Sequence, residues 1–214
     1  MPGLLAAGDA VGQAVALLLL AMSVASWVVI LWKGWLLQRA SGDVARSLAA
    51  FWQAGNLPDA KLHLQAFDRE ALVFPIVAAT EIEANNTLAN SGDRAQQLTR
   101  VMRNALHAVL RKLQFGQVLL ATVGTTAPFI GLLGTVWGIH HALTAIAAAG
   151  QISIDKVAGP VGEGLVMTAA GLAVAIPAVL AYNVYGRVIG RIEGELEGFA
   201  HDLHALLLPG EKAD

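Results

Sequence analysis

The apolar segment Gly159–Tyr185 is long enough to cross a bilayer and contains a single acidic residue, Glu163. A charge at the centre of a membrane costs about 2.5–3.5 kcal/mol on insertion scales, so an acid kept inside a span is a hypothesis about function. Two interpretations are open. Glu163 either lies hydrated in the first turn, where it complements the helix dipole, or faces a water-filled or helix-lined interior where it can take up and release protons.

The composition agrees with a membrane protein. Of the 214 residues, 56% are hydrophobic and 14% are charged, compared with about 25% charged residues in a typical soluble domain. The formal net charge of -2 gives no basic footprint for nucleic acid. The absence of cysteine excludes disulfides and thiolate metal sites.

Three apolar runs predict an all-α integral membrane protein with three transmembrane helices. The segments that we expect are a short periplasmic N-terminus (1–9), transmembrane helix 1 (10–35), a cytoplasmic helical region (36–113), transmembrane helix 2 (114–149), a periplasmic loop (150–158), transmembrane helix 3 (159–186) and a cytoplasmic amphipathic helix with a tail (187–214). The first run does not resemble a cleaved signal peptide, because the residues before it include Asp9 and no Lys or Arg. The short link between the second and third spans makes them antiparallel neighbours.

The cytoplasmic region shows helical periodicity with a turn signal at residues 55–58. Asn85-Asn86 and residues 90–93 are further breaks or helix caps. Between Arg94 and Leu113 an apolar stripe is predicted, formed by Leu98, Val101, Met102, Ala105, Leu106, Val109, Leu110 and Leu113. No breaker is apparent after this stripe, so we expect one long helix that continues into the second span. After residue 187 a second stripe, Leu196, Phe199, Leu203 and Leu206, is predicted, with Pro209-Gly210 ending the helix.

The distribution of basic residues predicts the orientation. All but one of the fourteen Lys and Arg residues lie on the side of residues 36–113 and the C-terminal tail, and Lys156 alone lies in the opposite loop. Basic residues are enriched on the cytoplasmic side, so we expect the N-terminus outside and the C-terminus inside.

Small residues in the spans predict close helix packing. The candidates are Gly131, Gly134, Gly138 and Gly171, because glycine lets helix backbones touch in a membrane. Pro128 and Pro177 predict kinks.

Hydroxyl groups are needed to extend a proton route from a lone carboxyl, and Thr135 and Thr168 are the candidates. The common alternative for a threonine in a span is a bond to its own preceding carbonyl. Glu163 and Thr168 are separated by roughly 140° around the helix, so a polar lining needs the second span and neighbouring copies.

The residues give weaker support to a metal site or an enzyme than to a proton route. His140 and His141 point about 100° apart on a helix and so are poorly placed to chelate one ion with Glu163. Glu193, Glu197, His201 and His204 follow one helical face, which is typical of a solvated surface. No phosphate loop, nucleophile elbow or His-Glu-x-x-His string is present, so we expect neither an enzyme nor a cofactor.

Several strings resemble the MotA/TolQ/ExbB proton-channel family over about residues 119–186. They are Thr126–Ile139, Gly162–Leu165, Thr168–Leu172, Ala175–Val179 and Tyr182-Asn183. By position, the family's pore glutamate falls on Glu163 and its two pore threonines fall on Thr135 and Thr168. The sequence departs from the common pattern at Gly164, Met167 and His140-His141.

The resemblance implies an inner-membrane subunit that forms a homopentamer in the lipid bilayer. The pentamer is implied to enclose an ExbD-like single-span partner with an intramembrane aspartate and to drive a TonB-like protein for outer-membrane nutrient uptake, for example of iron-siderophores. Residues 128–133 and 182–185 favour the ExbB branch over the TolQ branch, and three spans disfavour the MotA branch, which resembles a four-span protein. A membrane scaffold that conducts nothing is the alternative from a different class.

Overall fold

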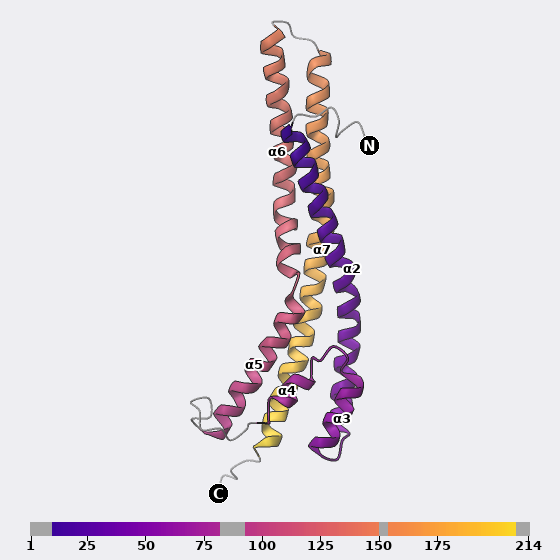
Figure 1. The fold of residues 1–214 in the computed structure, drawn as a ribbon, viewed down its shortest axis with the longest axis vertical. Helices are drawn as coiled ribbons and strands as arrows, with labels where there is room; N and C mark the ends of the chain where they lie inside the picture. The colour runs from indigo at the N-terminus through magenta and orange to yellow at the C-terminus, as the bar shows by residue number, and fades with distance from the viewer. Residues whose placement is uncertain (1–9, 82–92, 150–153, 209–214) are drawn as a thin grey trace. The chain divides into compact units, whose positions relative to one another are not determined.

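The structure is a computed structural model that describes residues 10–81, 93–149 and 154–208 (Figure 1). The helices are α2 (Ala10–Trp52), α3 (Leu57–Phe67), α4 (Phe74–Ala78), α5 (Arg94–Gln114), α6 (Gln117–Ala149) and α7 (Ile154–Leu207). The described residues contain no strand, which confirms the prediction of an all-α protein. Three helices, α2, α6 and α7, are long and apolar enough to cross a membrane, as predicted.

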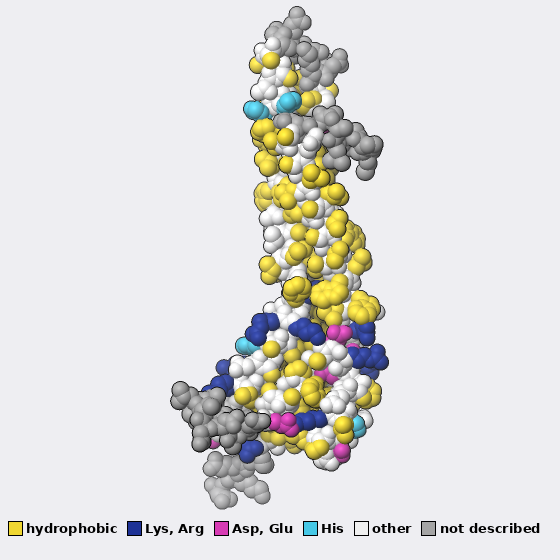
Figure 2. All heavy atoms as spheres, viewed as in Figure 1, with side chains coloured by type: hydrophobic (Ala, Val, Ile, Leu, Met, Phe, Trp, Pro, Cys, Tyr) yellow, Lys and Arg dark blue, Asp and Glu magenta, His cyan; other side chains and the backbone are white. Residues whose placement is uncertain are grey.

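The chain divides into two compact units. We call residues 1–33 and 116–184 the apolar unit and residues 34–115 and 185–214 the charged unit. Helices α2 and α7 contribute residues to both. Figure 2 shows charged side chains gathered around α3, α4 and α5, whereas the surface around α6 is largely hydrophobic.

The charged unit is built around large apolar side chains. Its core includes Leu37, Val44 and Phe51 from α2, Leu64 from α3, Ile76 from α4, Leu98, Met102 and Leu113 from α5, and Ile192, Leu196 and Leu203 from α7. The ring of Phe199 packs edge-on against Phe51, with 4.9 Å between the ring centroids. The α5 stripe faces this core as predicted. In the α7 stripe Leu196, Phe199 and Leu203 are buried, whereas Leu206, which the sequence placed on the same side of the helix, is 55% exposed.

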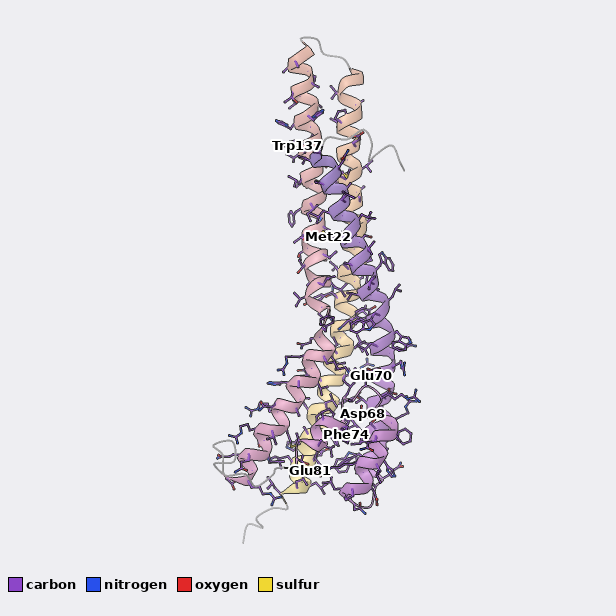
Figure 3. The ribbon with its side chains drawn as sticks, viewed as in Figure 1. Met22, Asp68, Glu70, Phe74, Glu81 and Trp137 are labelled. Carbon is purple, nitrogen blue, oxygen red and sulfur yellow. The ribbon has the colours of Figure 1, made fainter. Side chains whose placement is uncertain are left out.

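Two polar side chains shape the loops around α3. The Asn56 Oδ1 accepts a hydrogen bond from the Asp59 N–H at 2.9 Å and caps α3, which confirms the predicted turn and helix start. Asp68, labelled in Figure 3, accepts hydrogen bonds from the backbone N–H groups of Leu72, Val73 and Phe74 at 2.8, 2.9 and 2.6 Å. These bonds satisfy donors that would otherwise be buried without partners at the start of α4.

The prediction of one helix running from residue 94 into the second span is wrong. Helix α5 ends at Gln114 and α6 begins at Gln117, and between them Gly116 has φ +83°. Glycine adopts this left-handed conformation without the steric cost that a side chain brings. A Cβ at Gly116 would also lie 2.9 Å from the Val29 Cγ1. The breaker was therefore present in the sequence as a single glycine.

Several predicted boundaries also differ from the helix ends. Helix α2 continues past residue 35 to Trp52, and α7 runs without interruption through residue 186 to Leu207. The predicted loop 150–158 is wrong for residues 154–158, which are helical, and Pro160 lies inside α7. The predicted segment 1–9, the breaks at residues 85–86 and 90–92, Pro209-Gly210 and residues 150–153 lie outside the described residues.

Candidate functional site

Within the apolar unit, α6 and α7 meet backbone to backbone through glycines. A Cβ added at Gly131 would lie 2.6 Å from the Met167 carbonyl oxygen, and one at Gly171 would lie 3.2 Å from the Gly131 Cα. A Cβ at Gly138 would lie 2.5 Å from the Pro160 oxygen. Rising residue numbers on α6 pair with falling numbers on α7, so the two helices are antiparallel, as predicted.

Gly134 and Gly164 complete this contact. A Cβ at Gly134 would lie 2.7 Å from the Met167 Cβ and 3.3 Å from the Val15 Cγ1 of α2. A Cβ at Gly164 would lie 2.9 Å from the Thr135 Cα, so a side chain there would push α6 and α7 apart. In the sequence, Gly164 stands out only as a departure from a family pattern. Its position two helical turns before Gly171 was the signal for a packing role.

Thr135 and Thr168 lie opposite one another across the α6–α7 contact. Their hydroxyl groups are within hydrogen-bond distance of each other. The Thr135 hydroxyl also donates to the Gly164 carbonyl at 2.8 Å, and the Thr168 hydroxyl donates to the Gly131 carbonyl at 3.2 Å. The structure thus brings the two predicted threonines together, and their hydroxyls connect the helices.

Glu163 lies in a cavity of about 270 Å³ in the apolar unit. The lining residues are Gly12 of α2, Gly134, Trp137, Gly138 and His141 of α6, and Gly159, Pro160, Glu163, Gly164 and Met167 of α7. The Glu163 side chain is half-buried. Among the described residues its carboxylate has no hydrogen-bond or ion-pair partner, so Thr135 and Thr168 do not bind it in this chain.

The two histidines of α6 have different surroundings. His140 stacks on Trp137, which Figure 3 labels on α6, with 5.3 Å between the ring centroids. His141 instead lines the cavity that contains Glu163. In the described part of the chain, no group of three His, Cys, Asp or Glu side chains is placed to hold a metal ion.

The polar face near the end of α7 borders a cleft. Glu197, His201 and His204 line a cleft of about 530 Å³ in the charged unit, together with Arg103 and His107 of α5. The His204 Nε2 lies 3.1 Å from the Thr99 Oγ1. Glu197 and His201 are nonetheless exposed, as expected for a solvated surface, and His204 is half-buried beside Thr99 of α5.

Both predicted kink positions, Pro128 and Pro177, lie inside continuous helices, α6 and α7. Neither proline ends its helix. The kinks themselves stay predictions.

Comparison with known proteins gives a consistent picture. Residues 71–198 match the model of the MotA/TolQ/ExbB proton channel family. The chain is 43% identical over 215 residues to the Biopolymer transport protein ExbB of Xanthomonas campestris pv. campestris, covering 96% of this chain and 85% of that protein. It is 40% identical over 208 residues to a protein of the same name from Neisseria meningitidis, covering 94% of each.

A relative with a different name is more distant. The chain is 34% identical over 214 residues to the Tol-Pal system protein TolQ of Pseudomonas aeruginosa, covering 97% of this chain and 92% of that protein.

Proposed function

Because the chain belongs to the MotA/TolQ/ExbB proton channel family, we propose that it is the proton-conducting stator subunit of a TonB-type energy-transducing complex. The family is one of proton channels and not of enzymes. In the proposed function, the chain conducts protons down the gradient of the inner membrane, and their movement drives a mechanical change that energises nutrient uptake across the outer membrane.

The observation that carries the proposal is the environment of Glu163. Its carboxyl lies in a helix able to span a membrane, is half-buried in a cavity, and has no hydrogen-bond or ion-pair partner among the described residues. Ionisable groups inside spans are usually paired, so a carboxyl that has no partner among the described residues suits a group that exchanges protons or meets a partner from another chain.

The proposed partners follow from this incomplete site. We expect the chain to assemble as a homopentamer around the single span of an ExbD-like protein whose intramembrane aspartate lies near Glu163. A TonB-like protein receives the motion. The complex lies in the inner membrane of a Gram-negative bacterium, with the N-terminus outside and the C-terminus inside.

The driving force is sufficient for such a machine. One elementary charge moved through about 100 mV releases about 2.3 kcal/mol. A few protons per step therefore shift a two-state mechanical equilibrium that differs by several kcal/mol. Thr135 and Thr168 are the proposed hydroxyls beside this route.

The test is proton flux into liposomes that contain the chain with its single-span partner. We expect Glu163→Gln to abolish the flux while leaving the assembled complex intact, as measured by size-exclusion chromatography. The matched control is Glu197→Gln, because Glu197 is exposed in the charged unit and lies outside the spans. Undiminished flux in Glu163→Gln would contradict the proposal.

The second candidate is a TolQ-like subunit of a Tol-Pal system, which the 34% identity to the Pseudomonas aeruginosa protein supports. Both candidates share the conducting role of Glu163 and differ in the partner. Co-purification with an ExbD-like or a TolR-like protein from the native membrane distinguishes them. A scaffold that conducts nothing predicts no flux from the unmodified complex.

A further inference from the structure

We propose that His141 transfers protons between the aqueous phase and Glu163, through the cavity that the two side chains share. The inference rests on the proton-conducting function proposed above and extends it with a second titratable residue. Its basis is that His141 from α6 and Glu163 from α7 line the same cavity of about 270 Å³.

The two side chains differ in exposure in the direction that a relay requires. The His141 side chain is exposed, whereas Glu163 is half-buried. His141 precedes the end of α6 by roughly 12 Å of helix, and Glu163 follows the start of α7 by roughly 14 Å, so both lie at a similar distance from the connection between these helices. His141 is thus the more exposed of two titratable groups that lie at a similar distance along their helices from the α6–α7 connection.

The cavity has room for the water that a relay needs. A water molecule in the liquid occupies about 30 Å³, so a volume of about 270 Å³ accommodates several. An imidazole ring can both accept and release a proton. The imidazolium N–H gives its proton, directly or through water, to the Glu163 carboxylate, which becomes the carboxylic acid. The neutral imidazole then takes a proton from bulk water, so the step requires no other reactant.

The other described side chains around the cavity offer no competing proton carrier. The indole of Trp137 and the thioether of Met167 do not accept and release protons as a carrier must. The lining residue from α2 is Gly12, which has no side chain to do so. His140 is adjacent in sequence but stacks on Trp137. The chain therefore provides a matched control, since His140 has the same chemistry and nearly the same depth without lining the cavity.

The experiment measures proton flux at several pH values in liposomes containing the complex with its single-span partner. We expect His141→Ala to reduce the flux at least about tenfold near neutral pH, because a positioned proton donor contributes about 100-fold or more where it is required and water replaces part of it. His140→Ala is expected to match the unmodified complex.

Chemical rescue separates a relay from a packing role. Imidazole added on the side that carries the α6–α7 connection should restore much of the flux of His141→Ala and leave that of His140→Ala unchanged. Rescue also shows that the variant is folded, and His141→Asn provides a polar second variant should alanine prevent assembly. Full flux in His141→Ala, or a reduced flux in both assembled variants that imidazole does not restore, would overturn the relay.

Measuring Glu163→Gln in parallel shows whether a negative result contradicts the relay alone or the proposed function as well. If Glu163→Gln abolishes the flux while His141→Ala conducts normally, the relay is wrong and the proposed function stands. If Glu163→Gln conducts normally, the proposed function itself fails.

Discussion

Each of the two units of this chain has its own kind of internal packing, with large apolar side chains in the charged unit and glycines in the apolar unit. The charged unit buries large residues such as Leu64, Ile192 and Leu196, none of which is measurably exposed. In the apolar unit the helix contact is made by Gly131, Gly171 and other glycines, and large side chains such as Leu132 and Leu165 are exposed.

The surrounding solvent explains the difference. Burying apolar area stabilises a fold in water, so the charged unit gains from every large side chain placed inside. Lipid tails are as apolar as leucine, so helices in a membrane associate through close backbone contact and interhelical hydrogen bonds. We therefore predict that shortening a buried side chain destabilises the charged unit, whereas adding a side chain at a glycine destabilises the α6–α7 contact.

The largest loss is expected from a deletion in the core of the charged unit. Leu196→Ala should destabilise that unit by about 2–5 kcal/mol, because it removes buried methyl groups and leaves a cavity. Hydrogen exchange of α5 amides in the full-length protein measures the change. Leu206→Ala is the control on the same helix, and its effect should stay within about 0.5 kcal/mol because Leu206 is exposed. Equal effects of the two variants would contradict the core that we describe.

The opposite change tests the apolar unit. Gly131→Ala places a Cβ 2.6 Å from the Met167 oxygen, and this backbone atom cannot move without shifting α7. We expect a loss of about 1–3 kcal/mol, measured as a lower midpoint of thermal unfolding in detergent.

Gly162→Ala is the matched control, because no atom lies within 4 Å of the new Cβ. It should be neutral or stabilise α7 by up to about 1 kcal/mol through helix propensity. If Gly131→Ala were equally neutral, the glycines would not determine the distance between the helices.

The sequence was sufficient to predict the elements whose cause is local. The periodicity of Leu98 to Leu113 predicted the buried face of α5, and residues 55–58 predicted the start of α3. In both cases neighbouring residues alone determine the outcome. The strings around Thr135 and Glu163 instead indicated candidate site residues through a resemblance to a family, and the role of those residues stays a prediction.

Features that depend on distant segments were not predictable in the same way. Leu206 was placed on the same side as Leu203 but is exposed, whereas the following Leu207 and Leu208 pack against the core. The sequence also gave no indication that His141 and Glu163 share a cavity, since this depends on the register between α6 and α7. Gly116 shows a third limit, because a single glycine is compatible with both a helix interior and a helix end.

A smaller effect is expected at the start of α3, where a single side chain in water caps the helix. Asn56→Ala removes the Oδ1 that accepts the Asp59 N–H, and we expect a loss of about 1 kcal/mol. Increased hydrogen exchange in the first turn of α3 measures it. Asn56→Ser, which keeps an acceptor, should retain most of the protection, and equal exchange in both variants would show that the cap contributes nothing.

The smallest change in stability is expected at Thr135, although its functional effect should be large. Thr135→Val removes a hydroxyl that donates to the Gly164 carbonyl and lies within hydrogen-bond distance of the Thr168 hydroxyl. Interhelical hydrogen bonds in a membrane average about 0.6 kcal/mol, so the unfolding midpoint should fall only slightly. Thr135→Ser keeps the hydroxyl and should conduct protons at close to the original rate. If the valine variant conducts as well as the serine variant, Thr135 serves only to connect α6 and α7. A large loss of flux with almost unchanged stability would instead assign its hydroxyl to the proton route beside Glu163.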